Sequence, residues 1–64
     1  MTARADYATA GHDSGFTDGW AGNSYNPYDS TVPADYYATY RINYAQGYEE
    51  GQAAYRRAMD GIVP

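Results

Sequence analysis

The fold of this chain is decided by residues 34–60, which read ADYYATYRINYAQGYEEGQAAYRRAMD. Spacings of three and four residues separate a series of tyrosines and small residues, namely Tyr37, Tyr40, Tyr44, Tyr48, Gly51, Tyr55 and Ala58. Such spacings place side chains on one face of an α-helix. Pro33 suits the first turn of a helix, and Gly61 suits its end. The pattern predicts one long helix, striped with tyrosine, over about residues 33–60.

Two glycines, Gly47 and Gly51, lie inside this predicted helix, where each costs about 1 kcal/mol relative to alanine. Close approach of another backbone would compensate for that cost. Residues 15–21 (GFTDGWA) and 47–53 (GYEEGQA) share glycine, an aromatic residue, an acid, glycine and alanine in the same order. This repeat predicts that a second helical segment packs closely on the long helix, with the rings of one helix over the glycines of the other.

The second segment is expected over about residues 3–22, where glycine recurs at every fourth position in Gly11, Gly15 and Gly19. An alternative interpretation is that its glycines keep this segment irregular. Residues 23–32, rich in Asn, Ser and Asp and containing Pro27, predict a loop with a turn at residues 26–29. Ser30 or Thr31 is expected to cap the long helix. The predicted class is all-α, a small helical hairpin or bundle forming a single domain over residues 1–64.

Composition limits how such a domain is stabilised. The chain has 64 residues and no cysteine, which excludes disulfides, and its one histidine leaves no ligand set for structural zinc. Leucine is absent, but nine tyrosines and Trp20 supply apolar area for a thin core. A chain this short has no room for a deep substrate cleft. We therefore expect no cofactor and no metal site.

Charge limits the partners. Eight acids against four arginines give a formal net charge of −4, which disfavours direct binding to nucleic acid and favours a basic protein partner. No apolar run is long enough to span a membrane, and the first ten residues lack the apolar stretch of a signal peptide. The expected location is the cytoplasm.

Catalytic motifs are weak. The residues His12-Asp13-Ser14 contain the types of a hydrolytic triad, but three adjacent residues do not align as one. Neither glycine pair has the lysine of a phosphate-binding loop. The sequence predicts that the protein is not an enzyme.

The candidate partner-binding residues are acids and exposed tyrosines. Carboxylates opposite the tyrosine stripe form either an ordinary solubilising face or a surface that imitates nucleic-acid phosphates. Tyrosine is enriched in protein interfaces, and Tyr36 points away from the stripe and is expected to be exposed. The predicted set is Asp13, Asp18, Asp29, Asp35, Glu49, Glu50, Tyr25, Tyr28 and Tyr36.

Two resemblances extend this interpretation. Gly15-Phe16-x-x-Gly19-x-x-Gly22, then Pro27-Tyr28, then Tyr44-x-x-Gly47-Tyr48 resembles the ribosome modulation factor family over residues 15–48. That resemblance implies two helices and association with ribosomes, but the family is strongly basic and binds ribosomal RNA, whereas this chain is acidic.

The second resemblance is one of type. A short, acidic, cysteine-free and tyrosine-rich chain is similar to phage-encoded anti-CRISPR proteins that block the DNA-binding surface of a type I Cascade complex. It implies an inhibitor that acts by DNA mimicry on a CRISPR effector subunit in a bacterial host. The expected oligomeric state is a monomer or weak homodimer. The alternatives are a ribosome-associated factor and an assembly protein that buries its tyrosine stripe in a homo-oligomer.

Overall fold

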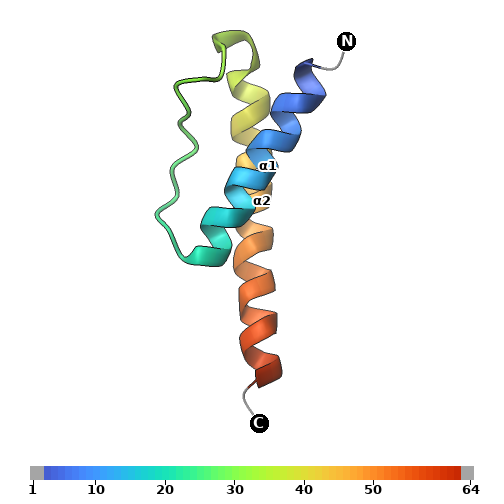
Figure 1. Ribbon diagram of the computed structural model, residues 1–64, viewed down its shortest axis with the longest axis vertical. Coiled ribbons are helices and arrows are strands. Elements are labelled where there is room, and N and C mark those ends of the chain that lie inside the picture. The colour runs from blue at the N-terminus through green and yellow to red at the C-terminus, as the bar shows by residue number, and fades with distance from the viewer. Residues whose placement is uncertain (1–2, 63–64) are drawn as a thin grey trace.

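The computed structural model describes residues 3–62, which form two α-helices, α1 (Ala3–Ala21) and α2 (Ala34–Ile62) (Figure 1). The ends of the predicted domain, residues 1–2 and 63–64, lie outside the described residues. The helices pack against each other, which confirms the all-α class with a glycine-rich first helix and a tyrosine-striped second helix. Neither described helix has a segment both long and apolar enough to cross a membrane.

The two helices run in the same direction. Figure 1 shows α1 descending, residues 22–33 returning along its side, and α2 descending again. We call residues 22–33 the strap. Twelve extended residues reach about 40 Å, more than the roughly 28 Å length of a 19-residue helix such as α1. The strap is therefore long enough to bring the chain back to the level at which α1 began.

Glycines form the contact between the helices. A Cβ on Gly15 would lie within 3.0 Å of the Tyr44 carbonyl oxygen, and a Cβ on Gly47 within 3.0 Å of the His12 carbonyl oxygen. The predicted close approach is thus confirmed, but it is between backbones and not between rings and glycines. The buried glycines of the contact are Gly11, Gly15, Gly19, Gly47 and Gly51.

Side chains add a thin core to this contact. Tyr40 and Tyr44, 3% and 1% exposed, are the buried large side chains among the described residues. At the C-terminal end of α1, Trp20 packs edge-on against Tyr55 of α2, with ring centroids 5.5 Å apart. Beyond Tyr55, α2 continues past the end of α1 (Figure 1).

The helix ends differ in part from the prediction. Gly22 has φ 75° and ends α1, where the amide of Asn23 donates to the Asp18 carbonyl at 2.9 Å. Ser30 and Thr31 do not cap α2, which begins later, at Ala34. Gly61 does not end α2 either, because the helix continues to Ile62.

The hydrogen-bonded turn of the strap lies later than predicted. It joins the Val32 amide to the Asp29 carbonyl at 3.2 Å, three residues beyond the expected turn at residues 26–29. The Asp29 carboxylate also accepts hydrogen bonds from the Thr31 amide and hydroxyl, at 2.8 and 2.6 Å. Asp29 therefore organises the turn that leads into α2.

Candidate functional site

Three tyrosine hydroxyls of α2 hold the strap. The Tyr48 hydroxyl donates to the Asn23 carbonyl at 2.6 Å, and the Tyr44 hydroxyl accepts from the Asn26 amide at 3.2 Å. The Tyr40 hydroxyl makes a longer contact, 3.5 Å, with the Asp29 carboxylate. Residues four apart on a helix lie one turn apart on the same face, so the three hydroxyls form a row. The strap lies along that row in the direction opposite to α2.

Asp18 connects this row to α1. Its carboxylate accepts a hydrogen bond of 2.5 Å from the Tyr44 hydroxyl and one of 3.1 Å from the Asn23 side-chain amide. Burial, together with the hydrogen bond to Asp18, raises the pKa of Tyr44 from 10.0 to about 12. Tyr44 therefore remains a neutral donor at physiological pH, and the Asp18 carboxylate is held in a fixed orientation.

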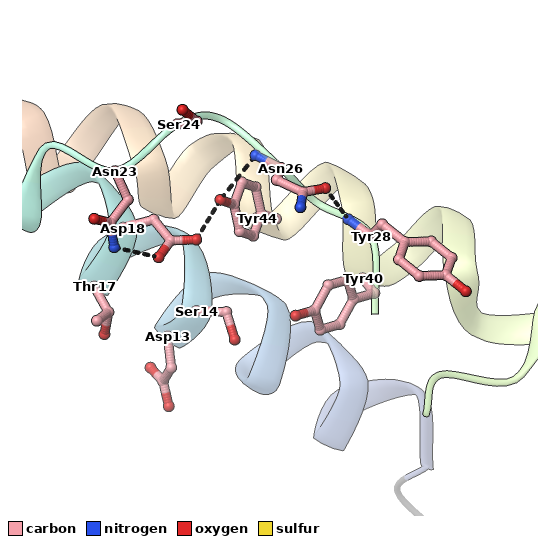
Figure 2. Close-up of a pocket in the computed structure, with 10 residues that line it drawn as sticks. All are labelled: Asp13, Ser14, Thr17, Asp18, Asn23, Ser24, Asn26, Tyr28, Tyr40 and Tyr44. Atoms are coloured by element: carbon pink, nitrogen blue, oxygen red, sulfur yellow. Dashed lines mark hydrogen bonds between the residues drawn. The ribbon is translucent and has the colours of Figure 1, made fainter. Parts of the chain in front are cut away.

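A polar groove of about 620 Å³ lies between α1 and the strap, lined by the ten residues labelled in Figure 2. Tyr40 and Tyr44 of α2 contribute to its lining. The rings of Tyr28 and Tyr40 lie toward one end in Figure 2, and Asp18 with Asn23 lies toward the other. None of the ten lining residues is basic.

The structure brings three of the predicted site residues together at this groove, namely Asp13, Asp18 and Tyr28. Asp13 is exposed, and Tyr28 is 67% exposed. Asp29 follows Tyr28 in the strap, but its carboxylate already accepts hydrogen bonds from Thr31 within the turn that leads into α2. Hydrogen bonds from the Thr31 side chain and backbone, and from Tyr40, lower the pKa of Asp29.

The other predicted acids lie apart from the groove. Asp35 is exposed in the first turn of α2, and Glu49 is exposed further along that helix. The Glu50 carboxylate and the His12 ring of α1 form a hydrogen bond, with Oε1 and Nε2 2.8 Å apart. The structure therefore does not bring all of the predicted acids to the groove.

The two remaining predicted tyrosines are also separate. Tyr25 is 51% exposed, but its ring packs edge-on against Tyr44 and Tyr48 at 5.3 and 5.1 Å. Tyr36 was expected to be exposed, and this is wrong. It is half-buried and stacks on Tyr7 of α1, with ring centroids 5.1 Å apart, because α1 extends to the level of the first turn of α2.

Sequence reasoning missed the polar residues that complete the groove, namely Ser14, Thr17, Asn23, Ser24 and Asn26. The sequence does contain a pattern that could have identified two of these residues, Asn23 and Asn26. Residues 23, 26 and 29 are Asn, Asn and Asp at three-residue spacing, and they meet tyrosines at four-residue spacing. These two spacings predict contacts between the strap residues and the tyrosines only once the strap is known to lie along α2.

The groove suits a cationic side chain. The exposed carboxylate of Asp13 can accept charge-assisted hydrogen bonds from a guanidinium or ammonium group. The exposed ring of Tyr28 can take the same kind of group on its face. Among residues 3–62, no three His, Asp or Glu side chains are close enough to hold a metal ion.

Comparisons of the chain with protein-family models, with curated proteins and with solved structures give no match.

Proposed function

We propose that this protein is a non-enzymatic inhibitor that binds a basic, nucleic-acid-binding surface of another protein. The observation that supports it best is the groove between α1 and the strap, which has acids and aromatic rings in its lining and no basic residue. The target we propose, on the resemblance to anti-CRISPR proteins, is the DNA-binding surface of a type I CRISPR effector.

In this proposal carboxylates of the groove replace DNA phosphates. Lysine and arginine side chains that hold phosphate oxygens can equally hold carboxylates. Asp18 is oriented by Tyr44 and Asn23, so little conformational freedom is lost when a basic side chain binds it. Asp13 adds an exposed charge from the same face of α1.

The net charge of −4 acts at longer range. It attracts a basic surface and accelerates association, and this effect falls as salt screens the charges beyond about 8–10 Å. The inhibitor should therefore bind its target more slowly and more weakly at high ionic strength.

The resemblance to ribosome modulation factor has a different explanation in this proposal. Gly15, Gly19 and Gly47, which carry that resemblance, are buried in the helix contact. They account for the packing of two helices, and the acidic groove does not suit RNA phosphates.

A pair of charge reversals tests the proposal. Asp13→Lys changes the groove, and Asp60→Lys makes the same change of charge near the end of α2, away from the groove. Both proteins are titrated against a purified type I effector in competition with its target DNA. We expect Asp13→Lys to weaken inhibition at least tenfold and Asp60→Lys to change it less than threefold.

Equal effects of the two reversals would show that only net charge matters and would refute the groove as the site. Failure of the unaltered protein to inhibit would refute the effector as the target. Recovery of ribosomes with the tagged protein from a cell lysate, in place of the effector, would instead support the ribosome-associated alternative.

A further inference from the structure

A second surface lies on the outer side of α2. Six exposed residues recur there with spacings of 3, 4, 3, 4 and 3, namely Ile42, Ala45, Glu49, Gln52, Arg56 and Met59. We call them the outer stripe. This spacing is that of the a and d positions of a heptad, and three of the six residues, Ile42, Ala45 and Met59, are apolar as in helices that pair along a common seam.

Most of the outer stripe lies outside the contact between α1 and α2, although Gln52 and Arg56 line a hollow with the end of α1. At about 100° per residue, its centre lies about 150° around α2 from Tyr40, Gly47 and Gly51, which contact α1. Ile42 is 61% exposed and Met59 is 36% exposed, at opposite ends of the stripe. Contact with α1 therefore gives no reason for apolar residues at these two positions.

We propose that a second copy of this chain binds the outer stripe, with the two α2 helices antiparallel. In the register that aligns the two stripes, Ile42 of each copy lies level with Met59 of the other. Ala45 lies level with Arg56, so a small residue faces the stem of a long one. Glu49 lies level with Gln52, whose side-chain amide can donate to the carboxylate.

Charge favours the antiparallel arrangement. Helical side chains tilt toward the N-terminus, so Arg56 of one copy extends toward the level of Glu49 of the other. In a parallel pair in the same register, Glu49 would face Glu49 and Arg56 would face Arg56. Like charges at such positions repel, whereas the antiparallel pair matches each acid with a base.

The surface beside Ile42 also fits this arrangement. A hollow of about 390 Å³ is lined by Tyr25 and Pro27 of the strap together with Arg41, Ile42 and Ala45. Met59 of the second copy lies at this level. A flexible thioether side chain fills irregular apolar space of this kind and packs well against aromatic rings.

This inference does not depend on the proposed function. No residue of the outer stripe lines the groove between α1 and the strap. A paired molecule would therefore present two grooves, one on each copy.

Sedimentation equilibrium over a range of concentrations tests the pairing. We expect the mean mass to rise toward twice the 7.1 kDa of one chain. Glu49→Arg and Arg56→Glu should each weaken the pairing at least tenfold, because each places like charges within one turn of each other across the two helices. The double variant, which exchanges the two charges, should recover pairing to within threefold of the unaltered chain.

Asp13→Arg, on α1, is the control and should leave the pairing constant within threefold. Circular dichroism of each variant checks that helicity is retained. A chain that stays at 7.1 kDa up to millimolar concentration would overturn the inference. So would a double variant that pairs no better than the single variants while remaining helical.

Cysteine cross-linking tests the direction, since the chain has no cysteine of its own. A mixture of Ile42→Cys and Met59→Cys proteins should form a disulfide-linked pair on mild oxidation, because these positions face each other. Either protein alone should cross-link at least tenfold less. Efficient cross-linking of Ile42→Cys alone would indicate a parallel pair, and no cross-linking in the mixture would exclude the register, so both would overturn the inference.

Discussion

The contact between α1 and α2 and the contact between α2 and the strap hold this small protein together in opposite ways. The first is made by glycines that bring the two backbones together. The second is made by tyrosine side chains whose hydroxyls reach the strap. A contact between backbones has no room for one added carbon atom. A contact made by tyrosine hydroxyls can instead weaken in steps, by the loss of one hydrogen bond at a time.

The largest expected effect tests the helix contact. Gly15→Ala places a methyl group against the Tyr44 carbonyl, and the helices must separate to admit it. We expect a net loss of about 2 kcal/mol or more in the free energy of unfolding, although alanine raises helix propensity by about 1 kcal/mol. Urea unfolding followed by circular dichroism measures it.

Gly61→Ala is the matched control, since nothing lies within 4 Å of a Cβ at that position. It should leave stability unchanged or raise it by up to about 1 kcal/mol. Equal stability changes for the two variants would contradict a contact limited by space.

The next effect tests the strap. Tyr44→Phe removes the hydroxyl that donates to Asp18 and accepts from the Asn26 amide. We expect a loss of about 1–3 kcal/mol, because two part-buried hydrogen bonds are lost. Tyr55→Phe, in a ring that is 42% exposed, is the control and should change stability by less than about 0.5 kcal/mol. Similar losses for both would show that the hydroxyl row does not hold the strap.

Alkaline pH should weaken the same contact without mutation. The pKa of Tyr44 is about 12 in the folded chain and 10.0 without burial and its partners, so the unfolded state loses this proton first. The contribution of Tyr44 is therefore complete below pH 10 and is lost as pH rises toward 12. Absorbance of tyrosinate should show a late-titrating tyrosine that Tyr44→Phe removes. Titration of all tyrosines together near pH 10 would contradict this.

The smallest effect concerns the pair between His12 and Glu50, which bridges the helices at the surface. Exposed ion pairs contribute about 0–1 kcal/mol. A double-mutant cycle with Glu50→Gln and His12→Asn should therefore give a coupling energy below about 1 kcal/mol. A larger coupling would mean that side chains, and not only glycines, determine how the helices meet.

Local patterns explain which parts of the fold were predictable. The spacing of Tyr40, Tyr44 and Tyr48 indicates one helix face whatever lies opposite, because 3.6 residues per turn is a property of the backbone. The glycines at positions 15 and 47 similarly indicate a close approach. Neither pattern contains the direction of the partner helix, since small residues admit a parallel or an antiparallel neighbour equally well.

The candidate site was less predictable, because its acids differ in their partners and not in their type. Asp18 and Asp29 accept hydrogen bonds from tyrosines 26 and 11 residues away, whereas Asp13 remains exposed. Tyr36 was misplaced for the same reason, since its neighbour Tyr7 comes from the start of α1. A helical wheel orients each side chain about its own helix but does not show what covers it.

The sequence by itself determined the long helix with its tyrosine face, the glycine spacing that indicates a close approach, and the sign of the charge, because the first two depend on residues within a few turns of one another and the third on composition alone. Only the tertiary structure decided that the helices run parallel, that the strap follows the row of tyrosine hydroxyls, and that a groove opens beside Asp13. These features depend on hydrogen bonds between residues 11 to 26 positions apart, and their pairing is fixed by the path of the strap.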